Sequence, residues 1–156
     1  MQRISALGLD IGKKRIGVAG CDGTGLIATG LTTIERAAFT SDVAQFQDLV
    51  RSREAQVLVV GLPYNMDGTL GFQAQQVQKY ASRLANSLNL PLEYVDERLT
   101  SVEAEAQLKS RKNYSSRDKG AIDRQAAAII LQQWLDYRRQ QQRHGELNPV
   151  TDRLTD

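Results

Sequence analysis

The sequence predicts an α/β protein built on a five-stranded mixed sheet flanked by helices, and two observations support this fold class. Three short segments with strand-like composition follow one another before residue 34, which predicts an antiparallel meander. Two further short apolar segments, residues 57–60 and 92–96, alternate with stretches of helical periodicity. Such alternation predicts two parallel strands, and right-handed crossovers place the first of them beside the N-terminal strand.

The three meander strands are separated by turn residues. Residues 3–10 alternate weakly and then become continuously apolar, as in a central strand, and Gly12-Lys13-Lys14 follows as a turn. Residues 15–20 form the second strand, close enough to pair with the first as a hairpin. Residues 26–33 are rich in Thr, Ile and Leu, which favours a third strand.

The central part of the chain changes to alternating helices and strands. Ser41 is the expected N-cap of a helix that reaches about Val50. Residues 57–60 are continuously apolar, as in a strand buried on both faces. A helix with one apolar face is expected over residues 72–88, and Pro91 separates it from the strand at 92–96.

Two more helices are expected toward the C-terminus. Thr100-Ser101-Val102-Glu103 matches a capping box, so a helix is expected to begin there and to end near Lys109. Residues 110–118 are polar and basic, and are expected to be mobile. A long helix is predicted from about Lys119 to Arg139, with a polar tail at 140–156 expected to be disordered.

Length and composition indicate a single soluble domain. The 156 residues correspond to one domain, assigned to residues 1–139. No apolar run reaches the roughly 18 residues of a membrane span, and no signal peptide is recognised, so a cytoplasmic protein is expected. Cys21 is the only cysteine and His144 the only histidine, which excludes an internal disulfide and a Cys/His zinc site. The net charge of +2 is weak support for an acidic partner.

Carboxylates stand at the ends of elements expected to face the core. Asp10 ends the first apolar run, Asp96 and Glu97 end the last predicted strand, and Asp123 begins the apolar stripe of the last helix. Asp10 could instead cap a turn, and Asp123 could interact with the helix dipole or pair with Lys119 or Arg124. Asp96 and Glu97 point to opposite faces of an extended strand, and alternation does not choose between them.

The carboxyl ends of parallel strands form one edge of a sheet, where ligand sites of such folds lie. Carboxylates gathered there would repel one another unless a cation offsets their charge, and hard oxygen ligands suit Mg²⁺ or Mn²⁺. The sequence therefore predicts a divalent-metal site. The cluster Lys13-Lys14-Arg15 could neutralise phosphates beside it, or could be an ordinary solvated turn.

Four segments resemble the YqgF (RuvX) family. They are Leu-Asp-Ile-Gly-Lys-Lys-Arg-Ile-Gly-Val-Ala at 9–19, Val-Val-Gly-Leu-Pro-Tyr-Asn-Met-Asp-Gly at 59–68, Val-Asp-Glu-Arg-Leu-Thr-Ser-Val-Glu-Ala at 95–104, and Lys-Gly-Ala-Ile-Asp-Arg-Gln-Ala-Ala at 119–127. The resemblance spans roughly residues 3–138. It implies an RNase H-like fold with Asp10, Glu97 and Asp123 as catalytic metal ligands, and so favours Glu97 over Asp96.

The resemblance also implies a function. It indicates a hydrolase that cuts phosphodiester bonds with two Mg²⁺ or Mn²⁺ ions, with Lys13, Lys14, Arg98 and Lys119 expected to hold substrate phosphates. Processing of the 5′ end of pre-16S rRNA in ribosome biogenesis is the leading expectation. The alternatives are a Holliday junction resolvase acting on branched DNA and a non-catalytic RNA-binding assembly factor. The expected protein is a monomer or a homodimer with no membrane partner.

Overall fold

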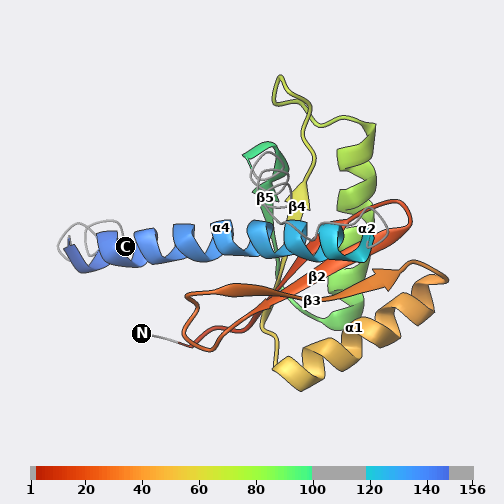
Figure 1. Ribbon diagram of the computed structural model, residues 1–156. Coiled ribbons are helices and arrows are strands. Elements are labelled where there is room, and N and C mark those ends of the chain that lie inside the picture. Colours follow the sequence, from red (N-terminus) through yellow and green to blue (C-terminus); the bar gives the residue numbers. More distant parts are fainter. Residues whose placement is uncertain (1–2, 100–118, 148–156) are drawn as a thin grey trace, which may run out of the picture.

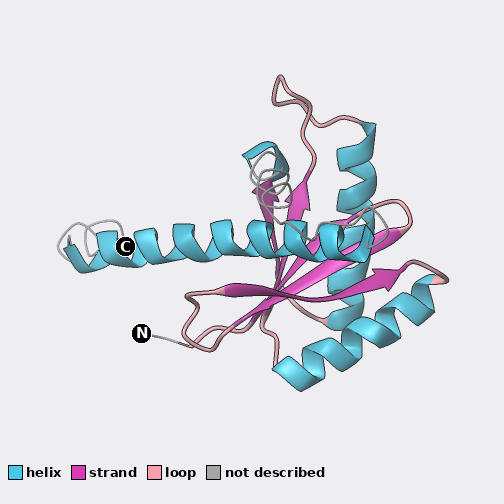
Figure 2. Cartoon of the chain, viewed as in Figure 1, coloured by secondary structure: helices cyan, strands magenta, loops and turns pink. Residues whose placement is uncertain are grey.

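The computed structural model describes residues 3–99 and 119–147. Its sheet has the strand order β3-β2-β1-β4-β5, with β1, β2 and β3 antiparallel and β1, β4 and β5 parallel (Figures 1 and 2). The elements are β1 (Ala6–Ile11), β2 (Arg15–Cys21), β3 (Ala28–Glu35), α1 (Phe39–Arg53), β4 (Val57–Leu62), α2 (Phe72–Leu88), β5 (Leu92–Asp96), the short 3₁₀ helix η1 (Glu97–Leu99) and α4 (Lys119–Leu147). The predicted five-stranded mixed sheet is confirmed.

Helices cover both faces of the sheet. Helices α1 and α2 lie on one face, and α4 crosses all five strands on the other (Figure 1). The period-2 alternation of β1 explains the division, because Leu7 and Leu9 face α1 and α2 whereas Ala6 faces α4. None of the described helices is apolar enough over a sufficient length to cross a bilayer.

Glycines bring α4 unusually close to the strands. A Cβ at Gly8 would lie 2.6 Å from Leu131 Cβ, and one at Gly17 would lie 1.9 Å from the main-chain oxygen of Asp123. A Cβ at Gly61 would lie 2.5 Å from Ile130 Cδ1. At Gly8 and Gly17 the helix therefore rests directly on the strands, and a side chain at either position would push it away, whereas at Gly61 the neighbour is the end of the Ile130 side chain.

Helix α1 begins before the predicted N-cap. It starts at Phe39 with Ala38 as the N-cap, so the prediction of Ser41 is wrong. The first turn is held instead by Asp42, whose fully buried carboxylate accepts hydrogen bonds from the Ala37 amide (3.0 Å) and the Tyr80 hydroxyl (2.9 Å). A carboxylate at this end of a helix also interacts favourably with the helix dipole.

Helix α4 also differs from its predicted length. It continues from the expected end at Arg139 to Leu147, so the first part of the expected tail is helical. The physical reason is that residues 140–143, three Gln and one Arg, are good helix formers although they offer no apolar face. The helix predicted at 100–109, the segment 110–118 and the tail after Leu147 lie outside the described residues.

Candidate metal and phosphodiester site

Three carboxylates lie near one another at the carboxyl-terminal edge of the parallel strands. Asp10 is the penultimate residue of β1, and Glu97 directly follows β5. Strand β4 lies between these two strands, and its Gly61 has no side chain to separate them. A Cβ at Gly61 would lie 3.6 Å from Glu97 Cδ, so the Glu97 side chain lies over β4 in ordinary contact with this position.

The carboxyl groups of Asp10 and Glu97 share a hydrogen bond. Burial, followed by the hydrogen bond and the negative charge of Asp10, raises the pKa of Glu97 to about 9. Burial also raises the pKa of Asp10, and the charge of Asp123 adds to this effect. Two carboxyl groups held this close retain a proton between them, because two adjacent negative charges in a buried site repel each other.

Asp123 lies on α4, with its main chain against Gly17 of β2. Gly17 is the register partner of Asp10, which places Asp123 beside Asp10 across the sheet surface. Its carboxylate accepts a hydrogen bond from Arg15 Nε at 2.8 Å, and the two side chains are 20% and 33% exposed. The sequence left open a structural role for Asp123, in which it would pair with Lys119 or Arg124. The observed ion-pair partner of Asp123 is Arg15.

The donor set fits a divalent cation. Three carboxylates supply hard oxygen ligands, and the proton shared by Asp10 and Glu97 marks the position where positive charge is needed. Within the described residues no three metal-ligating side chains already lie close enough together to form a cation site. Asp123 is drawn to Arg15, so ion binding would require its carboxylate to turn from the guanidinium toward the other two.

Asp96 faces away from this site. Arg98 donates to both of its oxygens, from Nε at 3.0 and 3.1 Å and from one Nη at 2.5 Å. The same guanidinium reaches the main-chain oxygens of Asn65 and Met66, at 3.4 and 3.3 Å. Arg98 thus joins the end of β5 to the loop that follows β4.

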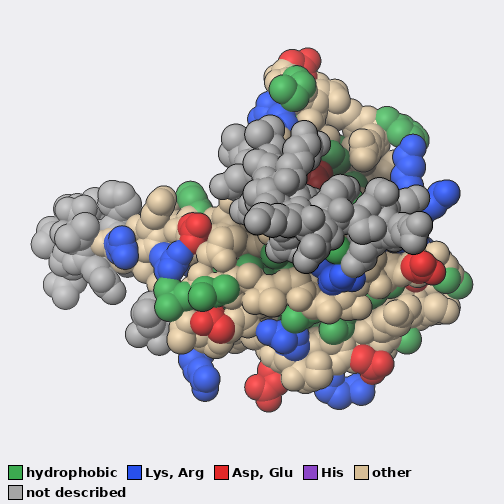
Figure 3. Space-filling view, viewed as in Figure 1, with side chains coloured by type: hydrophobic (Ala, Val, Ile, Leu, Met, Phe, Trp, Pro, Cys, Tyr) green, Lys and Arg blue, Asp and Glu red, His purple; other side chains and the backbone are tan. Residues whose placement is uncertain are grey.

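The predicted phosphate-binding residues have different surroundings. Lys13 and Lys14 are exposed in the turn between β1 and β2, close to Asp10. Arg98 remains 33% exposed at its side chain, although Asp96 already occupies much of its donor capacity. Lys119 is the first residue of α4, and its side chain lies outside the part of the chain that is described. On the face shown in Figure 3, basic and acidic side chains of the described residues are interspersed.

The sheet order and the carboxylates at its edge define an RNase H-like α/β protein. Thermus thermophilus RuvC bound to a Holliday junction substrate shares the fold, with a TM-score of 0.53 at 12% identity over 81% of this chain and 91% of that chain. A second T. thermophilus RuvC structure gives a TM-score of 0.52, also at 12% identity, over 81% of this chain and 92% of that chain.

Sequence comparison identifies the family. The family described as "RuvX: Holliday junction resolvase" matches residues 4–137. A protein of Rippkaea orientalis named "Putative pre-16S rRNA nuclease" is 78% identical over 139 residues, covering 89% of this chain and 100% of that protein. A Synechocystis protein of the same name is 65% identical over 144 residues, covering 92% and 95%. The chain belongs to the RuvX family, as the four sequence motifs predicted.

Proposed function

We propose that this protein is a metal-dependent endonuclease that hydrolyses phosphodiester bonds of precursor 16S ribosomal RNA. The observation that carries the proposal is the half-buried Asp10–Glu97 carboxyl pair beside Asp123, at the ligand-binding edge of the sheet. The high identity to relatives named as pre-16S rRNA nucleases supports RNA as the substrate. Acting on ribosomal RNA would place the protein in the cytoplasm.

Asp10, Glu97 and Asp123 would hold two divalent ions, Mg²⁺ or Mn²⁺. When bound, such ions polarise a phosphoryl oxygen and lower the pKa of a coordinated water. Asp10 lies on β1 and Glu97 directly follows β5, so both carboxylates are held by the sheet, and α4 positions Asp123 near them. Rigid placement of ligands favours the transition state, because no reorganisation is needed during the reaction.

Basic side chains around the edge would orient the substrate. Lys13 and Lys14 project from the turn that follows Asp10, where they could neutralise phosphates next to the cleaved bond. Arg15 balances the charge of Asp123 in the absence of metal, at 2.8 Å. Arg98 and Lys119 complete the proposed phosphate-binding set. None of these residues needs to form a covalent intermediate.

The test compares cleavage of a labelled pre-16S rRNA fragment and a four-way DNA junction, with Mn²⁺ and with chelator. Wild type is expected to cut the RNA only with metal. Asp123→Asn is expected to lose cleavage by at least a hundredfold, in the range found when a charge-stabilising group is removed. The control Asp48→Asn removes a carboxylate that is 80% exposed on α1, and should keep full activity.

The family description favours a second candidate, a Holliday junction resolvase. Metal-dependent cutting of the junction but not the RNA would establish that function instead. A resolvase needs two active sites for two symmetric cuts, so the active species would then be a homodimer, whereas RNA cleavage is compatible with a monomer. Salt-dependent binding without cleavage of either substrate would refute the nuclease proposal and leave a non-catalytic assembly factor.

A further inference from the structure

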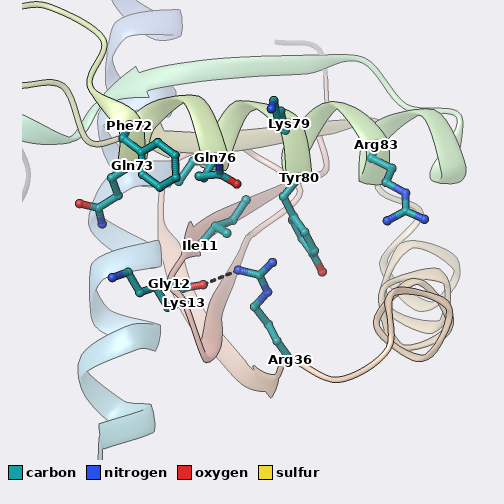
Figure 4. A pocket seen from close by; sticks show the side chains of 11 residues that line it. Ile11, Gly12, Lys13, Arg36, Phe72, Gln73, Gln76, Lys79, Tyr80 and Arg83 are labelled. Atoms are coloured by element: carbon teal, nitrogen blue, oxygen red, sulfur yellow. Dashed lines mark hydrogen bonds between the residues drawn. The ribbon is translucent and has the colours of Figure 1, made fainter.

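An open pocket of about 550 Å³ lies on the other side of the sheet from the three carboxylates. Helix α2 forms one wall, and the turn after β1 together with the segment after β3 forms the other (Figure 4). We call it the α2 pocket, and its chemistry comes from six side chains: Lys13, Arg36, Phe72, Lys79, Tyr80 and Arg83.

The α2 pocket is basic. Four of its lining residues are Lys or Arg and none is Asp or Glu. Arg36 is held in place, because its guanidinium donates to the main-chain oxygen of Gly12 at 2.7 Å and lies 4.3 Å from the centre of the Tyr80 ring. Lys13, Lys79 and Arg83 are exposed at the rim. A lining of four cations without a carboxylate attracts a polyanion.

The pocket also presents an aromatic ring. Phe72 is 77% exposed at the first residue of α2, although a phenyl ring is usually buried. Tyr80 lies two turns further along the same helix and is half-buried. Cations placed beside an exposed ring are the combination that binds single-stranded nucleic acid, since phosphates meet the cations and bases stack on the ring.

The turn between β1 and β2 connects the α2 pocket to the carboxylates. Its main chain is closed by a hydrogen bond from the Gly12 amide to the Arg15 oxygen at 2.9 Å. On one side Arg15 contacts Asp123, and on the other Gly12 and Lys13 line the pocket. Gly12 follows Asp10 by two positions in the sequence, roughly 7 Å of extended chain. A nucleic-acid strand leaving the carboxylates could therefore pass over this turn into the pocket.

We propose that the α2 pocket binds a single-stranded segment of the substrate that flanks the cleaved bond. This inference rests on the proposed nuclease function, and it names a substrate feature that the function alone does not. An unpaired base can turn its face toward Phe72, whereas the bases of a duplex are stacked on each other. The site would thus select substrates in which an unpaired strand adjoins the cleavage position.

The test measures binding of a fluorescent single-stranded oligoribonucleotide by anisotropy in chelator, so that cleavage plays no part. Phe72→Ala is expected to weaken binding roughly 5- to 150-fold, as for loss of one stacked base. The double variant Lys79→Gln/Arg83→Gln should reduce the slope of log affinity against log salt by about 1.4, or about 0.7 per lost phosphate contact. Both changes are on exposed positions of α2, and circular dichroism would confirm the fold.

Two controls match these changes. Tyr137→Ala removes an aromatic ring that is 62% exposed on α4, and Arg51→Gln removes an exposed cation at the far end of α1. Both should bind like wild type. A blunt RNA duplex should bind the Phe72→Ala variant as tightly as it binds wild type, because the pocket does not use paired bases.

Four outcomes would overturn the assignment. They are no single-strand binding by wild type, unchanged binding by the pocket variants, an equal loss in the controls, and an equal loss for the duplex. Failure of the nuclease proposal is distinguishable from these. If binding depends on the pocket residues but the protein cleaves no substrate, the pocket assignment is supported and the nuclease proposal is refuted. If the protein cleaves its substrate but binding does not depend on the pocket residues, the nuclease proposal is supported and the pocket assignment is refuted.

Discussion

A single methyl group added at Gly17 should remove most of the activity while the protein stays folded. In Gly17→Ala the new Cβ would lie 1.9 Å from the main-chain oxygen of Asp123 and 2.3 Å from its carbonyl carbon. Ordinary contact begins near 3.4 Å, so the first turn of α4 must move by about 1.5 Å. Both atoms belong to the main chain of Asp123, so the clash cannot be relieved by rotating a side chain.

The displacement of α4 should lower both the stability of the protein and its rate of cleavage. Overpacking of this kind costs about 1–3 kcal/mol, which would lower the Tm by roughly 2–12 °C for a domain of this size. Asp123 moves with the helix, and misplacement of a catalytic group by about 1 Å costs on the order of a hundredfold in rate. Gly17→Ala should therefore remain folded at 25 °C with activity reduced at least a hundredfold.

Gly30→Ala supplies the graded comparison. Its Cβ would lie 3.0 Å from Arg124 Cβ and 3.2 Å from the Arg124 main-chain oxygen, which requires a shift of only a few tenths of an ångström on the same helix. We expect a small loss of Tm and nearly full activity, measured by thermal denaturation and by metal-dependent cleavage. Full activity in Gly17→Ala would refute the conclusion that direct backbone contact positions Asp123.

Three further changes test the electrostatics. Because the pKa of Glu97 is raised, the folded protein keeps a proton that the unfolded chain loses, so the Tm of the metal-free protein should fall as the pH rises from about 4.5 to about 9. Glu97→Gln should flatten this dependence, and an unchanged slope would contradict it. Arg15→Gln frees the carboxylate of Asp123, so half-maximal cleavage should need less metal, with a stability change of less than about 1 kcal/mol. An unaltered metal titration would refute this competition. Asp42→Ala removes a fully buried carboxylate that accepts from two part-buried donors, and should cost about 2–4 kcal/mol in thermal denaturation, whereas Asp48→Ala, at an exposed position, should be neutral.

The strand order was predictable from the sequence, because the lengths of the apolar runs and the spacing between them indicate which strands are central and how they are connected. The continuous run at 57–60 indicated a strand buried on both faces, and it became β4, between β1 and β5. Element ends were less predictable, since they depend on side chains from elsewhere. Helix α1 begins at Phe39 because Asp42 is buried against Tyr80 of α2, a contact that no local pattern encodes.

The site was predictable only in part for the same reason. The predicted strand ends placed Asp10 and the Asp96–Glu97 pair at one edge of the sheet. The alternation of side chains along a strand could not show whether Asp96 or Glu97 faces the site. The structure separates them, because Arg98 holds Asp96 whereas Glu97 shares a hydrogen bond with Asp10. The ion pair of Arg15 with Asp123 joins residues 108 positions apart, a distance at which one sequence gives no signal.

The glycines of the strands explain why this site depends on the packing of the core rather than on a loop. Gly8 and Gly17 each allow α4 to approach a strand within a distance that any other residue would prevent. The position of Asp123 relative to Asp10 is then set by main-chain contact between a helix and a sheet. Close-packed interiors transmit such displacements with little relaxation. A substitution beneath α4 should therefore reduce activity before it unfolds the protein, even where it touches no carboxylate.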